Sequence, residues 1–396
     1  MISSIYIAKN VYGGDGLGRL GDGRVVFVPG AWAGEQVRAE IVEEKRHFVR
    51  ARLVEVVEPS PERIHSLVRP VPGMVYAELS EKGECEAKEA QLREFFDRAR
   101  LSIPEIVRVK NSTALNYRNK AVYHFAKQNG RWVIGYRTEP SHEIIDVESD
   151  PLVRPEINAK LSEIRKAVLM LLTEGPEIIR RETAAKSNLT IRWTAKTGVK
   201  WWVGDAPKGL ILKETTCGRD FEVSADGFYQ VNPEVGELLV GAVVAEYEKC
   251  KSDSPEILDL YCGVGVFGLC CRPSKLVGIE SGNQAIECAR KNAVNQKFNN
   301  ARFYAERVGL NLRRIGVNSH TTVLVDPPRG GLEPNVPKWL AQSKASRIFY
   351  VSCDPATLVR DLKIICRGYD IESIRWFNMF PRTARFETLV VLKRKV

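Results

Sequence analysis

The sequence has no long apolar segment and no cysteine pattern of a secreted or zinc-binding protein. No apolar run approaches the ~20 residues that a membrane-spanning helix needs, and the first residues lack the basic region and apolar core of a signal peptide. The nine cysteines are an odd number and form no CxxC pair, which argues against a disulfide framework and a zinc site. We therefore expect a cytoplasmic globular protein that binds no metal and no membrane.

Basic residues outnumber acidic ones, and their distribution is uneven. The formal net charge of +10 at pH 7 favours a polyanionic partner. Residues 180–213 hold eight Lys and Arg against only Glu182 and Asp205, together with Trp193, Trp201 and Trp202. Basic side chains follow a phosphate backbone and aromatic rings stack on unpaired bases, so this segment suits single-stranded or loop RNA. An amphipathic sheet with a solvated basic face is the alternative.

The pattern of the chain predicts three domains. Residues 1–59 contain short strands broken by glycines, with Val49, Ala51 and Leu53 alternating with Arg50 and Arg52, which indicates a small β-barrel with a basic edge. Residues 60–225 mix helical and strand patterns and form a central α+β domain. Residues 226–396 alternate strands and helices in the manner of an α/β, doubly wound parallel sheet.

A glycine-rich turn follows the first predicted strand of the third domain. The segment 259–268, DLYCGVGVFG, contains Gly263 and Gly265 and formally matches GxGxxG. Glycine there lets the backbone approach a nucleotide-like ligand beyond the carboxyl end of the strand. Glu280, which ends the next strand, is placed to bind ribose hydroxyls. Taken alone, this motif is also compatible with a dinucleotide-binding site.

Two further motifs lie beside strands of the same predicted sheet. Asp326 ends a strand and precedes Pro327-Pro328, a stiff turn that would hold its carboxylate rigidly at the cleft. Such a turn suits gripping a planar base near a methyl donor and has no role in hydride transfer, although it could merely end an edge strand. Glu387 follows the segment FPRTARF and begins the last strand.

Cys353 lies at a predicted strand-to-helix turn. Residues 347–351 predict a buried strand, and Asp354-Pro355 predicts an N-cap followed by proline at the first helical position. Amides at a helix N-terminus favour the thiolate and would lower the pKa of this cysteine from ~8.5, whereas Asp354 acts in the opposite direction. A buried structural cysteine is the alternative.

In combination, DPPRGG, SCDP and FPRT with a following glutamate resemble the RNA uracil-C5 methyltransferase family, which makes 5-methyluridine with S-adenosylmethionine. GGDGLGR and VVFVPGAWAGE in residues 1–59 resemble the TRAM barrel of that family. The resemblance implies a class I, Rossmann-like methyltransferase domain at 226–396. It implies Cys353 as the nucleophile and Glu387 as the base that removes the proton from carbon 5. Around the cofactor and target base it places Gln230, Tyr261, Gly263, Gly265, Glu280 and Asp326.

The chemistry is consistent with these residue types. Carbon 5 of uracil is too weak a nucleophile to take a methyl group directly, and addition of a thiolate at carbon 6 creates an enolate that can. A base must then remove the proton from carbon 5 so that the thiolate can leave. The target base must also be splayed or flipped out of helical RNA.

The sequence departs from the family at several positions. Val71, Pro72, Gly73 and Met74, and also Asp150, stand where many relatives carry iron–sulfur cysteines, so we expect no cluster. Val266 and Arg307 replace asparagines that often contact the cofactor, and Arg385 replaces a histidine that precedes the base.

The sequence leaves more than one substrate and more than one function open. The barrel favours large-subunit ribosomal RNA over tRNA as the substrate. A methyltransferase acting on a base amino group and a catalytically silent RNA-binding protein are the two rival functions. The oligomeric state and the target uridine do not follow from the sequence.

Overall fold

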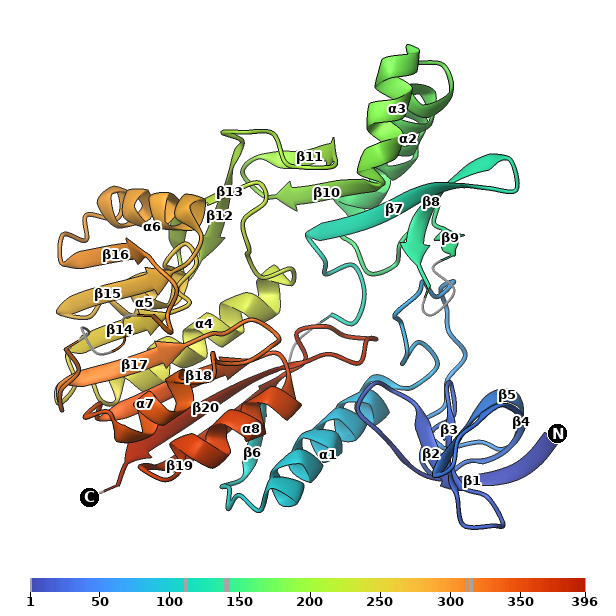
Figure 1. Cartoon of the computed structure of the whole chain (residues 1–396), viewed down its shortest axis with the longest axis horizontal. Helices are drawn as coiled ribbons and strands as arrows, with labels where there is room; N and C mark the ends of the chain where they lie inside the picture. Colours follow the sequence, from blue (N-terminus) through green and yellow to red (C-terminus); the bar gives the residue numbers. More distant parts are fainter. Residues whose placement is uncertain (1, 110–112, 139–142, 311, 313–315, 396) are drawn as a thin grey trace. The chain divides into compact units, whose positions relative to one another are not determined.

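The computed structural model describes residues 2–109, 113–138, 143–310, 312 and 316–395 (Figure 1). By contacts the chain divides into two compact units. Unit 1 comprises residues 1–98 and 380–386, and unit 2 comprises residues 99–379 and 387–396. Residues 60–98 thus group with the barrel, and the division at 59 and 225 stays a prediction. No helix among the described residues is long and apolar enough to cross a membrane.

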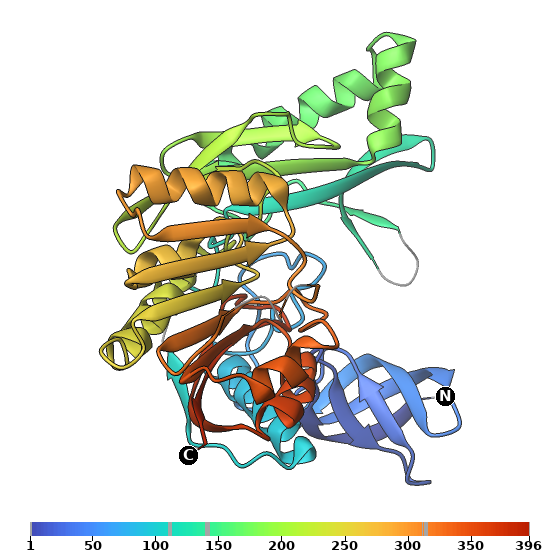
Figure 2. The ribbon, with the colours of Figure 1, turned by 60° about the vertical axis from the view of Figure 1, so that its left-hand side comes forward.

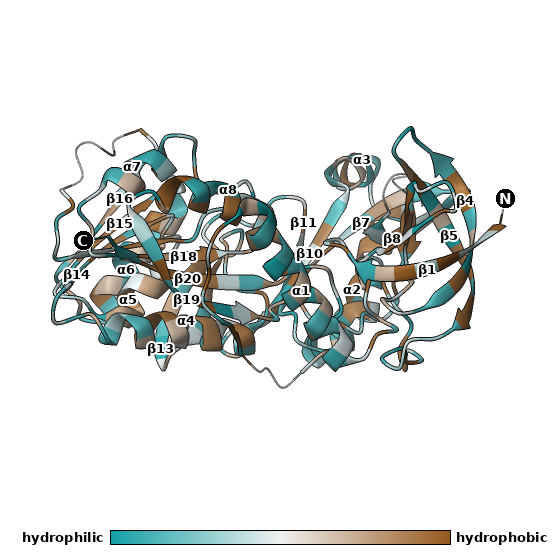
Figure 3. Cartoon of the chain, turned by 90° about the horizontal axis from the view of Figure 1, so that it is seen from below, coloured by the Kyte–Doolittle hydropathy of each residue, from teal (hydrophilic) through white to brown (hydrophobic). Residues whose placement is uncertain are grey.

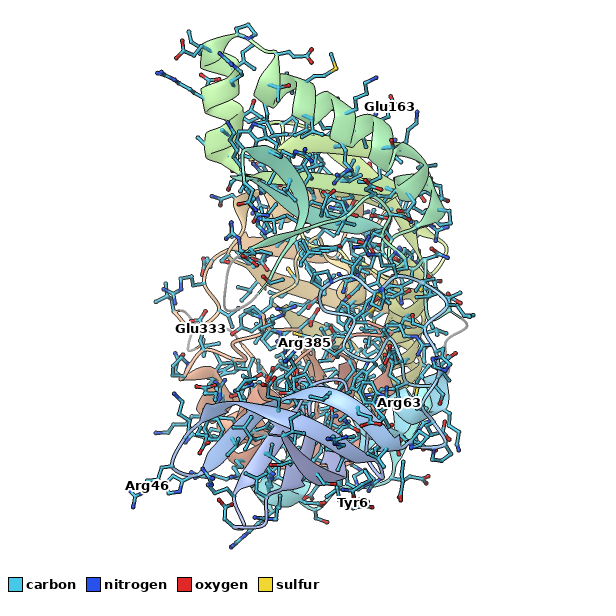
Figure 4. The ribbon with its side chains drawn as sticks, turned by 90° about the vertical axis from the view of Figure 1, so that its right-hand side faces the viewer. Tyr6, Arg46, Arg63, Glu163, Glu333 and Arg385 are labelled. Carbon is cyan, nitrogen blue, oxygen red and sulfur yellow. The ribbon has the colours of Figure 1, made fainter. Side chains whose placement is uncertain are left out.

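Unit 1 contains the predicted barrel, which is closed by five strands in the order β1-β2-β3-β5-β4. The strands are β1 (Ile2–Asn10), β2 (Gly16–Arg19), β3 (Val25–Val28), β4 (Gln36–Glu44) and β5 (Phe48–Glu58). Val49 and Ala51 are buried in its apolar core, whereas Arg50 and Arg52 are exposed, as the alternation predicted. Tyr6 and Arg46 are also exposed (Figure 4).

Strand β2 was not predicted, because its glycines read as turn residues. A Cβ atom added at Gly16 would lie 2.6 Å from the carbonyl oxygen of Ala31, and one at Gly18 would lie 2.5 Å from that of Tyr6. Neither position has room for a side chain. These glycines therefore permit a close approach of backbones inside a strand.

Helix α1 (Glu81–Ala99) of unit 1 carries a buried ion pair. The Lys88 ammonium donates to Glu84 at 2.8 Å, and both side chains are fully buried. The backbone N–H of Arg382 also donates to both oxygens of Glu84, at 2.9 and 3.0 Å. Glu84 therefore ties α1 to the segment 380–386, which lies just before Glu387 in the sequence.

Unit 2 contains a five-stranded sheet in the order β11-β10-β7-β8-β9, with α2 and α3 beside it (Figure 1). These elements are β7 (Lys120–Gln128), β8 (Arg131–Arg137), β9 (Ile144–Asp146), α2 (Pro155–Thr173), α3 (Glu177–Lys186), β10 (Asn188–Thr194) and β11 (Gly198–Val203). The basic segment 180–213 thus spans α3 and the β10–β11 hairpin. Its Arg192 is buried and pairs with Glu214 at 3.2 Å, so this cation is not available to a partner.

The second sheet of unit 2 has eight strands in the order β16-β15-β14-β17-β18-β20-β19-β6. They are β6 (Ile106–Val109), β14 (Glu256–Leu260), β15 (Lys275–Glu280), β16 (Ala301–Ala305), β17 (Thr321–Val325), β18 (Arg347–Ser352), β19 (Tyr369–Phe377) and β20 (Glu387–Arg394). A separate hairpin pairs β12 (Ile211–Thr216) with β13 (Arg219–Ser224). Strands β14 to β18 are parallel, whereas β20 runs antiparallel to β18. The predicted doubly wound α/β domain is confirmed.

Helices cover both faces of the eight-stranded sheet. They are α4 (Pro233–Glu248), α5 (Val266–Cys271), α6 (Asn283–Asn295), α7 (Val336–Gln342) and α8 (Pro355–Ile365). Figure 3 shows α7 and α8 on one side of the strands and α4 and α5 on the other. The parallel strands lie side by side between them (Figure 2). This arrangement follows from right-handed crossovers, because the strand order reverses at β14.

Helix α5 packs so closely on β14 and β15 that it buries a carboxyl group. A Cβ atom at Gly268 would lie 2.5 Å from Leu276 Cδ1 and 3.0 Å from Asp259 Oδ2. Asp259 is fully buried, and its Oδ2 accepts a hydrogen bond from the N–H of Gly268 at 3.2 Å. Its Oδ1 has no hydrogen-bond partner in the structure. Burial raises the pKa of Asp259 to about 8, and the neighbouring charges of Asp326 and Glu280 act in the same direction.

We expect Glu84→Ala to destabilise unit 1 by about 3–5 kcal/mol, because it removes the carboxylate that neutralises the buried Lys88 ammonium. Chemical denaturation of the full chain, followed by a probe in unit 1, measures the loss. Glu86→Ala is the matched control, since Glu86 is exposed on the same helix. Equal unfolding midpoints for the two variants would contradict the importance of the buried pair.

We expect the free energy of unfolding to depend on Asp259 between pH ~4 and pH 8. Its pKa of about 8 in the folded chain exceeds the ~3.9 of an unfolded chain, so the folded state binds more protons and stability falls as pH rises through this window. Asp259→Asn should remove up to about 1.4 kcal/mol per pH unit of that slope. Urea unfolding across the window measures it, with exposed Asp253→Asn as the control. An unchanged slope in Asp259→Asn would refute the assignment.

Candidate active site

Strand register brings Cys353, Glu387 and Asp326 to one edge of the eight-stranded sheet. Ser352 of β18 pairs with Thr388 of antiparallel β20, so Cys353 follows its strand where Glu387 begins its own. Val325 of β17 pairs with Tyr350 of parallel β18, so Asp326 leaves the sheet at the same edge. Three chemically active side chains separated by up to 61 positions in the sequence therefore converge.

A cavity opens beside the glycine turn at this edge. It encloses about 550 Å³, counted out to its open mouth. Four residues predicted to bind the cofactor line it, namely Gln230, Tyr261, Gly263 and Asp326. The remaining lining residues come from β12, the loop before α4, α4 itself, the glycine turn and α5. They are Thr216, Phe228, Tyr229, Pro233, Gly236, Val240, Cys262, Val264, Val266 and Phe267. A largely apolar wall with a few polar groups is typical of a small-molecule site.

The glycine turn has the backbone conformation that the sequence predicted. Gly263 and Gly265 have φ values of +52° and +85°, which favour glycine, and Gly265 is the N-cap of α5. A Cβ atom at Gly265 would lie 3.1 Å from Leu269 and 3.2 Å from Phe303, so this residue lets the turn pack onto its own helix. Tyr261 also has a positive φ of +64°, and its N–H donates to the carbonyl oxygen of Ile279 at 2.8 Å.

Two predicted cofactor residues do not line the cavity. Gly265 is the N-cap of α5 and packs against Leu269 and Phe303. Glu280 stands at the end of β15, where its Oε1 accepts hydrogen bonds from the N–H of Gly282 at 2.8 Å and from the Ser281 hydroxyl at 3.0 Å. Its carboxyl group is thus turned onto the loop that follows it.

Cys353 is half-buried, and its environment disfavours the thiolate. Burial raises the pKa of the Cys353 thiol to about 12, and the carboxyl groups of Glu387, Asp326 and Asp354 act in the same direction, whereas Arg329 lowers it. Burial and the neighbouring carboxyl groups therefore outweigh the helix amides, whose balance against Asp354 the sequence left open. Asp354 Oδ1 accepts hydrogen bonds from the N–H groups of Ala356 and Thr357, both at 3.1 Å, so two helix amides already have an acceptor.

Glu387 and Asp326 are carboxyl groups with raised proton affinity. Glu387 is 4% exposed, and its Oε2 has no hydrogen-bond partner in the structure. Burial raises the pKa of Glu387 well above its ordinary value, the charge of Asp326 adds to the rise, and Arg329 opposes it. Asp326 is partly exposed at the cavity wall, and desolvation raises its pKa to about 7. The edge thus combines a thiol with two carboxyl groups that retain protons easily.

Arg329 is a charged residue of this site that sequence reasoning did not single out. It follows the double proline after Asp326, and its cation acts on both Cys353 and Glu387. The arginine is visible in the DPPRGG motif, but only the fold shows that its charge acts on Cys353 and Glu387. Phe228, which is 69% exposed beside the cavity, is a second such residue.

The three departures from the family pattern have different surroundings. Val266 lines the cavity and presents an apolar side chain. Arg307 is exposed and pairs with Glu333 at 3.7 Å. Arg385 lies in unit 1, where its guanidinium donates to the hydroxyl of Tyr12 at 2.7 Å (Figure 4).

The positions expected to lack iron–sulfur ligands have other contacts. Asp150 is buried and accepts hydrogen bonds from the hydroxyls of Tyr123 and Tyr136, at 3.2 and 2.7 Å. Cys85 is buried in α1. Over the part of the chain that the structure describes, no cluster of three or more His, Cys, Asp or Glu could hold a metal ion.

Two family models match the chain. Residues 215–395 match the tRNA (Uracil-5-)-methyltransferase model, and residues 7–54 match the TRAM domain model. An RNA methyltransferase of Thermotoga maritima, described as uncharacterized, is 28% identical and covers 99% of both chains. The 23S rRNA (uracil(1939)-C(5))-methyltransferase RlmD of Pectobacterium atrosepticum is 26% identical over 96% of this chain and 90% of its own.

A solved structure shares the fold. The tRNA (uracil-54, C5)-methyltransferase of Pyrococcus abyssi, in complex with S-adenosyl-L-homocysteine, superposes with a TM-score of 0.75 at 23% identity, covering 98% of this chain and 100% of its own. The chain thus combines a TRAM domain with a domain of the tRNA (Uracil-5-)-methyltransferase family.

Proposed function

We propose that the chain methylates carbon 5 of a uridine in RNA, with S-adenosylmethionine as the methyl donor and Cys353 as a covalent nucleophile. The observation that carries the proposal is the convergence of Cys353, Glu387 and Asp326 at one sheet edge, beside the cavity that the glycine turn opens. The match of residues 215–395 to the tRNA (Uracil-5-)-methyltransferase model supports methylation at carbon 5 of uracil. The solved relative with S-adenosyl-L-homocysteine supports the cofactor class.

The cavity residues fit an adenosine-like ligand with a charged amino acid tail. The turn at Gly263 has no Cβ atom to exclude a ligand, and the wall combines aromatic rings with the Gln230 amide and the Asp326 carboxyl. Gln230, Tyr261, Gly263 and Asp326 would hold the donor, and Gly265 would support the turn. Glu280 would have to turn away from Gly282 to reach ribose hydroxyls. S-adenosylmethionine, when bound, supplies an electrophilic methyl group.

Cys353 and Glu387 then divide the reaction into addition and elimination. The thiolate of Cys353 forms a bond to carbon 6 of uracil, and the electron pair of the C5=C6 double bond moves into an enolate. Carbon 5 of that enolate would take the methyl group of S-adenosylmethionine, whose methyl–sulfur bond would break to leave S-adenosylhomocysteine. The Glu387 carboxylate removes the remaining proton from carbon 5, and that electron pair restores the double bond while the carbon–sulfur bond breaks. A carboxylate with raised proton affinity is the stronger base for this step.

We propose large-subunit ribosomal RNA as the substrate, in preference to tRNA. Curated relatives named 23S rRNA (uracil(1939)-C(5))-methyltransferase match over nearly the whole chain, at 26–27% identity. The solved relative named for tRNA has lower identity, at 23%. The net charge of +10 suits either polyanion.

Cys353→Ala should abolish both methyl transfer and the covalent RNA adduct, because no thiolate can add to carbon 6. Glu387→Gln should retain addition and methyl transfer but stop before elimination, so methylated RNA accumulates on the protein. Denaturing electrophoresis with labelled RNA, followed by mass spectrometry of the adduct, measures both results. Cys366→Ala is the control, since Cys366 lies at the far end of α8.

Outcomes of the same assay separate the rival functions. Full activity in Cys353→Ala would favour a methyltransferase acting on a base amino group, which needs no nucleophile. Absence of activity in the unaltered chain, together with no heat of binding for S-adenosylmethionine in calorimetry, would favour a silent RNA-binding protein.

Unmodified 23S ribosomal RNA should gain 5-methyluridine in vitro, whereas unmodified tRNA should gain little or none. Nuclease digestion and mass spectrometry locate the product, and the Cys353→Ala variant provides the background. Methylation of tRNA alone would reject the ribosomal substrate while leaving the uracil-C5 reaction intact.

A further inference from the structure

A group of side chains on α8 holds the loop that follows Asp326. Thr357, Arg360 and Asp361 lie three and four positions apart and so share one face of the helix. All three contact the backbone of residues 329–332, which comprise the end of the DPPRGG motif and the residue after it. We call these three side chains the α8 clamp.

The clamp makes four hydrogen bonds to the loop backbone. Asp361 Oδ2 accepts from the N–H of Leu332 at 2.9 Å. Arg360 donates to the carbonyl oxygens of Gly330 at 3.1 Å and Leu332 at 3.4 Å. The Thr357 hydroxyl donates to the carbonyl oxygen of Arg329 at 3.4 Å. These bonds join two segments that lie about thirty residues apart in the sequence.

Asp361 is the fixed point of the clamp. It is 2% exposed, and it also accepts hydrogen bonds from the Tyr350 hydroxyl at 2.8 Å and from Arg360 Nε at 2.9 Å. Gly331 fits closely against it. Its φ is +76°, and a Cβ atom there would lie 2.4 Å from the Arg360 guanidinium and 2.8 Å from Asp361 Oδ2. The loop therefore has little freedom to shift along α8.

The two clamped segments carry the reactive groups of the site. Helix α8 begins at Pro355, two residues after Cys353. The loop begins directly after Asp326 and carries Arg329, whose cation acts on Cys353 and Glu387. A rigid connection between segments is what fixes such groups relative to each other, and displacements of about 1 Å can cost ~10²-fold in rate.

We propose that Thr357, Arg360 and Asp361 are positioning residues, which hold Arg329 and the loop after Asp326 in a fixed relation to Cys353. The expected effect of the clamp on kcat rests on the proposed function. Its effect on the chemistry of Cys353 does not depend on RNA methylation and is measured separately.

Arg360→Met tests the clamp, because Arg360 is half-exposed and methionine retains its aliphatic length. We expect kcat for RNA methylation to fall at least about tenfold, with a smaller change in KM. We also expect slower alkylation of Cys353 by iodoacetamide without RNA, at a fixed alkaline pH below the pKa of the thiol. Asp326 stays beside the sheet through its N–H bond to Leu260, whereas Arg329 moves with the loop, so the thiolate loses the cation that favours it and keeps the carboxyl groups that disfavour it. Peptide mass spectrometry assigns the alkylated cysteine.

Three further variants separate positioning from charge and from stability. Gly331→Ala changes no charge but forces the loop away from Asp361, so both kcat and the alkylation rate should fall. Lys363→Met removes an exposed cation from the same helix without touching the loop, and both rates should stay unchanged. Tyr369→Phe removes buried hydrogen bonds to Ser343 and Ala345 but none to α8 or the loop, so it should lower the unfolding midpoint and leave both rates unchanged.

The alkylation measurement distinguishes failure of the clamp from failure of the proposed function. Wild-type rates of alkylation in Arg360→Met and Gly331→Ala would overturn the proposal, whether or not the chain methylates RNA. Equal loss of rate in Tyr369→Phe would also overturn it, because general destabilisation would then explain the effect. An inactive wild-type chain would reject the proposed function, while slower alkylation in the two clamp variants would still support the clamp.

Discussion

The antiparallel pairing of β20 with β18 is the constraint on which the candidate site depends. In an all-parallel sheet the start of a strand lies at the edge opposite to the active edge, and Glu387 would then be remote from Cys353. Reversing the last strand places its first residue at the carboxyl ends of the others. A residue at a strand start thereby becomes a buried neighbour of a residue at a strand end. The glycine turn after β14 and the carboxyl group after β17 meet the same edge by ordinary parallel register.

Much of the α/β domain could be predicted from its sequence, because each strand is a short apolar run and each helix has a clear start. Asp354 and Pro355 predicted the beginning of α8, and the structure places the N-cap and first helical residue there. Local signals suffice where one residue specifies a cap or a turn.

Features that depend on contacts distant in sequence could not be predicted. Strand β2 is rich in glycine because two backbones approach it closely, and only the closed barrel reveals that need. Arg192 counted as part of a basic surface, but Glu214 and the carbonyl oxygens of Ala225 and Gly227 enclose it. Side-chain direction is decided by tertiary neighbours, which no local pattern contains.

The raised pKa values at the edge impose an order on the proposed reaction. The carboxylate of Glu387 adds to the larger effect of burial in disfavouring the Cys353 thiolate, and by the same repulsion a thiolate at Cys353 disfavours ionisation of Glu387. Addition to carbon 6 converts the thiolate into a neutral thioether, and that repulsion then disappears. Glu387 can therefore ionise more readily after addition than before it, at the stage where a base is required. Repulsion between the two anions, which adds to burial in making Cys353 a poor thiolate, thus favours a protonated Glu387 until addition to carbon 6 is complete.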